Sequence, residues 1–278
     1  MEINNVIHAI VEKRPSKICK TPYMADIIIE ESEYLAHSPS LGCSGLTDKE
    51  CNVLVTQINS KNTKSSHKIQ FSIVNEIWKN ENYENIVCTN PQIAENIIEN
   101  ALKKNALKNI KAKEFKGQVT FENSRFDFAG IDENDIEFII EVKAVPVADY
   151  HNVSKQDKKK MVKNNTFVDK SPKDKIAIFP DGYIKPSKEP KPQSERANKH
   201  ILELTNIKQN SKKRTIMYYV VQRHDANSFV ISDLDPIYKE NVKLAKENGV
   251  ELYYIQMQWV KNGNSVIGNI VLENSVNV

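Results

Sequence analysis

Residues 138–145, FIIEVKAV, form an apolar run that is interrupted by one glutamate and one lysine. Side chains of a β-strand point alternately to its two faces, so a strand here places Glu141 and Lys143 on the same face. Burying a charge in an apolar strand costs free energy unless the charge is paired. The run therefore predicts a strand with one packed face and one face that carries chemistry.

A second interrupted run, SRFDF at 124–128, comes one strand earlier. Alternation places Arg125 and Asp127 on one face of that strand and the two phenylalanines on the other. The connection AGIDEND contains the glycine and the polar residues of a hairpin. If the two strands pair antiparallel, Asp127 and Glu141 can approach each other, depending on the register.

Two carboxylates that converge with a lysine can hold a hard divalent cation, typically Mg²⁺. The cation activates a water, and the ammonium group of Lys143 can support developing negative charge or position that water. An Asp, a gap and then Glu-x-Lys on the next strand is the pattern of PD-(D/E)XK nucleases. The alternative is a solvated Glu–Lys pair at a strand edge, which contributes little stability.

Composition sets broad limits on the class of protein. The chain has 278 residues, 40% of them hydrophobic and 27% charged, which is typical of globular proteins. A net charge of +3 is too small to indicate a nucleic-acid partner by itself. No apolar run approaches the roughly 18 residues of a membrane span, and the N-terminus lacks a secretory signal pattern. We therefore expect an intracellular, cytoplasmic protein with no membrane partner, whose four cysteines are free thiols.

The hydrophobic pattern of the chain changes near residues 86–90, which predicts a domain boundary there. Residues 1–85 contain short strands broken by polar turns, which suits a small barrel. Pro91 then opens a segment with apolar residues at helical spacing, Ile93, Ile97, Ile98 and Leu102. Further along, the lysine-rich stretch 154–175 predicts a mobile loop, and KPSKEPKPQ at 185–193 predicts an extended, exposed insert.

Several motifs occur together and in the order of one known family. Besides NSRFDF at 123–128 and EVKAV at 141–145, they are YLAHSPSLGCSGL at 34–46, FPDG at 179–182, ERANKHILEL at 195–204, VVQRHDANSF at 220–229 and DPIYKENVKLAKENGVELYY at 235–254. With these motifs the chain resembles the sugar fermentation stimulation protein A (SfsA) family. The resemblance implies an OB-fold, nucleic-acid-binding domain over 1–85, followed over 86–278 by a PD-(D/E)XK nuclease-like domain, a mixed sheet flanked by helices.

The resemblance also assigns candidate site residues. Asp127, Glu141 and Lys143 match the metal-and-lysine core, with Asp127 and Glu141 as ligands of Mg²⁺ or Mn²⁺. Glu114 is the weaker match to an acidic residue ahead of SRFDF. The further candidates for catalysis or nucleic-acid binding are Arg125, Lys199, His200 and His37.

Each of the binding candidates has an alternative interpretation. Arg125 contacts a phosphate or pairs with Asp127 or another acid, and Lys199 acts at the site or forms an i,i+4 pair with Glu203. A second group shares a place in the lysine-rich stretch and could contact backbone phosphates or merely solubilise the chain: Lys155, Lys158, Lys159 and Lys160. Three aromatic residues could stack on bases or belong to the core: Tyr23, Tyr34 and Phe71.

Two functions follow as hypotheses. The first is a metal-dependent nuclease that hydrolyses phosphodiester bonds of DNA or RNA, with single-stranded nucleic acid among its possible substrates. The second is a non-catalytic DNA-binding regulatory protein of the same family. The sequence leaves open whether the protein forms a homo-oligomer.

Overall fold

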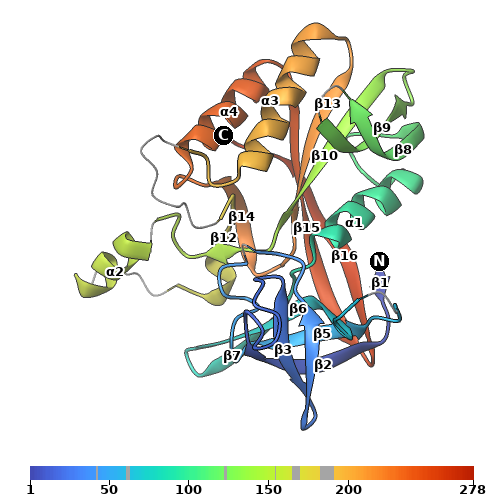
Figure 1. Cartoon of the computed structure of the whole chain (residues 1–278). Coiled ribbons are helices and arrows are strands. Elements are labelled where there is room, and N and C mark those ends of the chain that lie inside the picture. Colours follow the sequence, from blue (N-terminus) through green and yellow to red (C-terminus); the bar gives the residue numbers. More distant parts are fainter. Residues whose placement is uncertain (42, 61–62, 122–123, 154, 165–169, 182–190) are drawn as a thin grey trace.

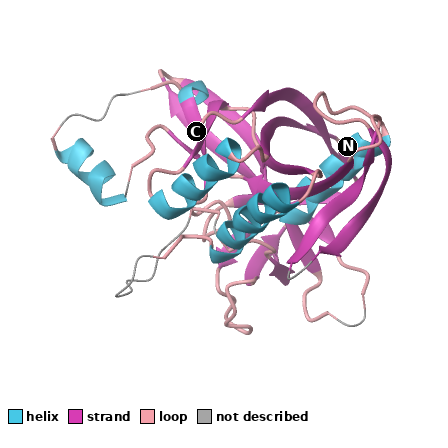
Figure 2. Ribbon diagram, turned by 90° about the horizontal axis from the view of Figure 1, so that it is seen from above, coloured by secondary structure: helices cyan, strands magenta, loops and turns pink. Residues whose placement is uncertain are grey.

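The computed structural model describes the whole chain except residues 42, 61–62, 122–123, 154, 165–169 and 182–190. Its described residues form three β-sheets, and helices cover the largest of them (Figures 1 and 2). None of the helices in the described ranges combines the length and apolar character needed to cross a bilayer.

The N-terminal sheet is a six-stranded barrel-like unit at the bottom of Figure 1. Its strands, in the order in which they pair, are β4 (Ser32–His37), β3 (Met24–Ile29), β2 (Val6–Lys13), β5 (Asn52–Gln57), β6 (His67–Trp78) and β7 (Glu81–Cys88). A short parallel pairing between β4 and β6 brings the sheet back onto itself. Inward-facing apolar residues such as Val11, Ile27 and Ile69 are fully buried and form the barrel core.

The central sheet has seven strands of mixed direction. Their order is β1 (Glu2–Ile3), β16 (Ser265–Ser275), β15 (Glu251–Asn262), β13 (Arg214–Val221), β10 (Glu137–Val145), β9 (Ser124–Asp132) and β8 (Ala112–Phe121). Strands β10, β13 and β15 run parallel, while the β8–β9–β10 and β15–β16 pairs are antiparallel. The predicted hairpin at AGIDEND is present, and a second hairpin joins β15 to β16 at KNGN, residues 261–264.

Helices cover both faces of this sheet. Helix α1 (Pro91–Lys103) packs its apolar stripe against one face, with Ile140 and Tyr218. Helices α3 (Glu195–Asn210) and α4 (Pro236–Glu247) pack against the other face, with Ile139 and Tyr219. Neighbouring residues of β10 and β13 thus enter different cores, as strand alternation requires.

A small third sheet lies beside α3 and α4. It consists of β11 (Ala148–Asp149), β12 (Lys175–Phe179) and β14 (Ala226–Ile231), with a 3₁₀ turn η1 (Pro172–Asp174) ahead of β12. The segment VVQRHDANSF runs from the end of β13 into β14, which lies directly above the barrel in Figure 1.

The prediction of a mobile loop over 154–175 is wrong for Lys155–Lys163, which forms helix α2. Lysine, glutamine and methionine are good helix formers. Asp157 in the first turn and Lys160 and Lys163 in the last turn also suit the helix dipole. Figure 1 shows α2 standing away from the sheets. Of the predicted insert 185–193, residues 185–190 lie outside the described residues.

The two units share a core instead of meeting at a flexible linker. Strand β7 ends at Cys88 and α1 begins at Pro91, with Asn90 accepting a hydrogen bond from the Gln92 N–H. The ring centroid of Phe71 in the barrel lies 5.0 Å from the ring centroid of Trp259 in the central sheet. In addition, Glu2–Ile3 form strand β1, which pairs antiparallel with β16 of the central sheet.

Candidate active site

Asp127 and Glu141 meet where β9 and β10 separate. The last paired residues of the two strands are Phe128 and Ile140. Just beyond this pair, the Val142 N–H donates a hydrogen bond of 2.8 Å to Oδ2 of Asp127. Both carboxylates are buried, with exposed fractions of 6% and 2%, and both line one pocket.

The strand around Asp127 is irregular, which corrects one expectation. Phe126 and Phe128 were predicted to share a face, but Phe126 packs on the side of α3 and Phe128 on the side of α1. Across the β8–β9 ladder, Gln118 lies between the paired residues Gly117 and Val119 and has a φ of 54°, outside the strand region. Gln118 lies opposite Asp127 in this register, so the irregular backbone falls beside the site.

Lys143 and His200 hold one oxygen of Glu141. Oε1 of Glu141 accepts hydrogen bonds from Nζ of Lys143 and from Nδ1 of His200, and those two nitrogens lie 3.2 Å apart. His200 comes from α3 and is buried. The second oxygen, Oε2, is buried and has no hydrogen-bond partner among the described residues.

The two acids ionise differently because their surroundings differ. Burial, with the nearby Glu141 and Glu95, raises the pKa of Asp127 from 3.8 to about 7. Burial alone would also raise the pKa of Glu141, but Lys143 and His200 outweigh it and lower that pKa below its ordinary value. Of the two acids, Glu141 therefore ionises at the lower pH.

Glu95 is a third acid of this pocket, and the sequence pattern did not reveal it. It lies on α1, lines the pocket and accepts a hydrogen bond of 2.9 Å from Nε2 of Gln118. The same Nε2 lies 3.4 Å from Oδ1 of Asp127. By contrast, the predicted Glu114 is exposed on β8, where it pairs with Ile131, and does not line the pocket. Only the packing of α1 on the sheet distinguishes Glu95 from other helical glutamates.

The pocket has a volume of about 280 Å³ and opens between two helix N-termini. Thr89 and Pro91 at the start of α1 line one side, and Ser194 and Arg196 at the start of α3 line another. Helix N-termini present unpaired N–H groups and partial positive charge, which favours anions. Arg196 belongs to the ERANKH motif but was not among the predicted site residues.

The other predicted residues lie elsewhere. Lys199 is exposed on α3 and its Nζ lies 3.6 Å from Oε1 of Glu203, the predicted i,i+4 pair. Arg125 is exposed and donates a hydrogen bond of 2.7 Å to Oε1 of Gln118 instead of pairing with Asp127. His37 is half-buried at the end of β4, beside Lys68, and does not line the pocket.

The remaining candidates for nucleic-acid contact are distributed over both units. Lys159 and Lys160 are exposed on α2, while the side chains of Lys155 and Lys158 lie outside the described residues. Tyr23 and Tyr34 are about two-fifths exposed, whereas Phe71 is fully buried in the core and cannot stack on a base.

A metal ion would find oxygen ligands here, but few of them from side chains. Among the described residues no group of three or more His, Cys, Asp or Glu is arranged as a metal site. Mg²⁺ in proteins is commonly held by one or two carboxylates together with waters and substrate phosphates. Asp127 and the unpartnered Oε2 of Glu141 meet that smaller requirement.

A sequence profile described as the sugar fermentation stimulation protein RE domain matches residues 92–155 and 148–263, more than half of the chain. The chain belongs to the SfsA family. Sugar fermentation stimulation protein homologues of Clostridium perfringens (strain 13) and Clostridium novyi (strain NT) are 26% and 27% identical to it, with 91% of each chain covered.

The fold of the SfsA family is also present. The solved structure of Pyrococcus furiosus SfsA in complex with Ca²⁺ matches with a TM-score of 0.71 and 17% identity, covering 100% of this chain and 98% of the other. The predicted fold class, a barrel followed by a nuclease-like mixed sheet flanked by helices, is therefore confirmed.

Proposed function

We propose that this SfsA-family protein is a metal-dependent nuclease that hydrolyses phosphodiester bonds of DNA or RNA in the pocket around Glu141. The observation that carries the proposal is the buried pair of acids, Asp127 and Glu141. One carboxylate oxygen of Glu141 accepts a hydrogen bond from Lys143, and the other has no partner among the described residues. Burying such a group without a partner costs free energy, so a cation at this place would stabilise the site.

Each side chain has a distinct role in this proposal. Asp127 and Glu141 would hold Mg²⁺ or Mn²⁺, which lowers the pKa of a bound water and neutralises charge on the phosphoryl group. Lys143 lies within hydrogen-bonding distance of Glu141 and can donate to the attacking water or to the developing charge. His200 fixes the orientation of Glu141 from the side of α3.

The cationic wall of the pocket supports a phosphate-containing substrate. Arg196 and residues at the N-termini of α1 and α3 line the pocket together with the two acids. Guanidinium groups and helix N-termini both favour phosphate oxygens. Such contacts position a backbone without reading its bases.

Ca²⁺ is an oxygen-preferring cation, and the SfsA of Pyrococcus furiosus was solved in complex with it. That observation concerns the Pyrococcus protein. It supports the proposal that the site of this chain takes a hard divalent cation.

The test is a cleavage assay with single- and double-stranded DNA and RNA, in the presence of Mg²⁺, Mn²⁺ or EDTA. We expect cutting only with metal, and a loss of at least about 100-fold in the Glu141→Gln variant, whose binding to the same substrates in a gel shift persists. Binding by the wild-type protein without any cutting would instead support the non-catalytic DNA-binding regulator. Equal cutting by Glu141→Gln would indicate a contaminating nuclease.

A further inference from the structure

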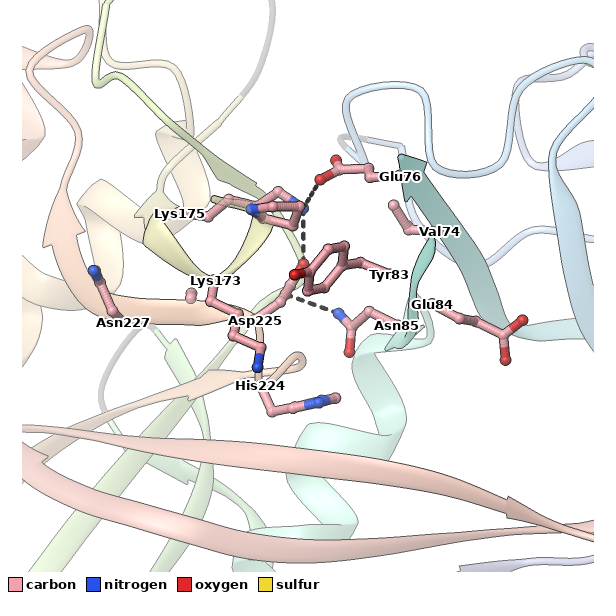
Figure 3. A pocket seen from close by; sticks show the side chains of 12 residues that line it. Val74, Glu76, Tyr83, Glu84, Asn85, Lys173, Lys175, His224, Asp225 and Asn227 are labelled. Carbon is pink, nitrogen blue, oxygen red and sulfur yellow. Dashed lines mark hydrogen bonds and ion pairs between the residues drawn. The ribbon is translucent and has the colours of Figure 1, made fainter. Parts of the chain in front are cut away.

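A second cavity, of about 260 Å³, lies between the barrel and the third sheet (Figure 3). The β6–β7 hairpin forms one wall, and η1 and the start of β14 form the other. Within the described residues its lining is separate from that of the active-site pocket. The motif VVQRHD reaches this cavity with His224 and Asp225, and the proposed nuclease chemistry gives them no role.

The buried charges of this cavity neutralise one another. Nζ of Lys175 lies 2.8 Å from Oε2 of Glu76 and 2.9 Å from Oδ2 of Asp225. Arg223 donates to both oxygens of Asp225, at 2.6 Å each. Because these groups are paired in a nearly closed network, the cavity is better suited to a neutral ligand than to an ion.

Asn85 offers an acceptor in the same wall. Its Nδ2 donates a hydrogen bond of 2.8 Å to Oδ1 of Asp225, and an ionised carboxylate can only accept, so the orientation of the amide is fixed. Figure 3 shows the amide oxygen turned away from Asp225. Asn85 is 5% exposed, and its Oδ1 is buried with no partner among the residues that the structure describes. A ligand with an N–H donor would satisfy it.

Tyr83 supplies a flat aromatic wall two residues earlier on β7, on the same face as Asn85. Nζ of Lys173 lies 5.9 Å from the centroid of the Tyr83 ring, and the Trp78 ring packs edge-on at 6.4 Å. Nζ of Lys79 lies 4.3 Å above the Trp78 ring. Aromatic rings with adjacent lysines are typical of surfaces that bind single-stranded nucleic acid.

Arg223 links this cavity to the active site. It donates a hydrogen bond to Asp225, which lines the cavity, and one of 3.3 Å to the carbonyl of Pro146, which lines the active-site pocket. The two pockets therefore lie about one side chain apart, a separation that a nucleic-acid strand can bridge. We propose that the cavity binds one nucleobase of the strand whose backbone occupies the active-site pocket, by stacking on Tyr83 and donating an N–H to Asn85. This inference rests on the proposed function, because it requires a nucleic-acid substrate.

The test compares Tyr83→Ala with Tyr83→Phe, both in a Glu141→Gln background so that the oligonucleotide stays intact. Phenylalanine keeps the ring and loses only the hydroxyl, which donates to Glu81 at the exposed surface. The probe is a single-stranded oligonucleotide with one 2-aminopurine placed at successive positions. We expect a fluorescence change at one position, lost in Tyr83→Ala and kept in Tyr83→Phe.

The decisive measurement uses an oligonucleotide with an abasic site at the position where 2-aminopurine responded. The abasic site should weaken binding to the Tyr83 protein about tenfold, as loss of one stacked base does, and leave binding to Tyr83→Ala unchanged. If Tyr83→Ala binds as tightly as Tyr83→Phe and no position responds, the cavity does not hold a base, while cleavage by the wild type would leave the proposed function standing. If the wild type neither binds nor cuts nucleic acid, the proposed function itself fails.

Discussion

The backbone N–H of Val142 donates a 2.8 Å hydrogen bond to the carboxylate of Asp127 where the ladder between their strands ends. Beyond that point the side chain takes the place of a backbone acceptor. The hydrogen bond holds the Asp127 side chain beside Glu141. Both residues lie on strands of the central sheet and not on loops. Sites held by strands keep their geometry better than sites on loops.

Asp127→Asn should weaken metal binding and yet stabilise the metal-free protein. The amide oxygen can still accept from Val142, while the repulsion from Glu141 and Glu95 that raises the pKa of Asp127 disappears. In EDTA at pH 8 we expect a Tm that is higher by about 2–4 °C, as a gain near 1 kcal/mol would produce. Added Mn²⁺ should raise the Tm of the wild type and not that of the variant.

The control for this thermal experiment is Asp135→Asn, which removes an exposed carboxylate that pairs with Lys113 at the surface. Its Tm should respond to Mn²⁺ as the wild type does. A normal Mn²⁺ response of Asp127→Asn would remove Asp127 from the proposed metal site.

Lys143→Met should reduce cleavage by about 100-fold or more, because it removes the ammonium group next to Glu141. The matched control is Lys199→Met, on the exposed face of α3, where Nζ lies 3.6 Å from Glu203. We expect its cleavage rate within about twofold of the wild type, since surface pairs contribute little. Initial rates with Mn²⁺ measure both variants, and equal losses would contradict the placement of these two lysines.

Glu95→Gln should lower the cleavage rate by about tenfold, because Glu95 is the third acid of the active-site pocket. Glu99 lies one turn later on α1 and pairs with Lys103 at 2.6 Å on the surface, so Glu99→Gln should cut like the wild type. The Mn²⁺ concentration that gives half-maximal rate should rise for Glu95→Gln alone. Identical metal dependence of the two variants would exclude Glu95 from the site.

Asp225 should make the fold acid-sensitive. Burial alone would raise its pKa, but Arg223 and Lys175 outweigh burial and lower it below 3.8. An acid with a lowered pKa in the folded state stabilises the fold above its ordinary pKa and loses this contribution as the pH falls through the folded value. The contribution of Asp225 is therefore complete near pH 7 and declines below about pH 4.

Urea unfolding of Asp225→Asn tests this pH dependence. At pH 7 the variant should lose about 3–5 kcal/mol, because Arg223 stays charged and buried without its carboxylate partner and Lys175 loses one of its two carboxylates. The difference from the wild type should shrink as the pH is lowered below 4. Asp233→Asn, which breaks an exposed pair with Lys239, should change stability by less than about 1 kcal/mol at either pH. A constant difference across pH would assign the loss to packing.

The part of the site that the sequence predicts correctly follows from the alternation of side chains along a single strand. Period-two alternation in FIIEVKAV places Glu141 and Lys143 on one face of β10, and their contact follows. The same rule failed for Phe126 and Phe128, because the positive φ of Gln118 and the separation of β9 from β10 interrupt the ladder. Such an irregularity depends on three strands at once, so one strand's sequence does not show it.

The sequence by itself determined strands β9 and β10 with the hairpin between them, helix α1, and the family motifs that contain Asp127, Glu141 and Lys143, because periodicity and turn chemistry are properties of neighbouring residues. Only the tertiary structure decided that Glu95 and Arg196 line the pocket, that His200 faces Glu141 while Lys199 faces outward, and that β7 and β14 enclose a second cavity. These placements follow from how helices and sheets pack on one another. Packing joins residues far apart in the chain, and no local pattern encodes which of them meet.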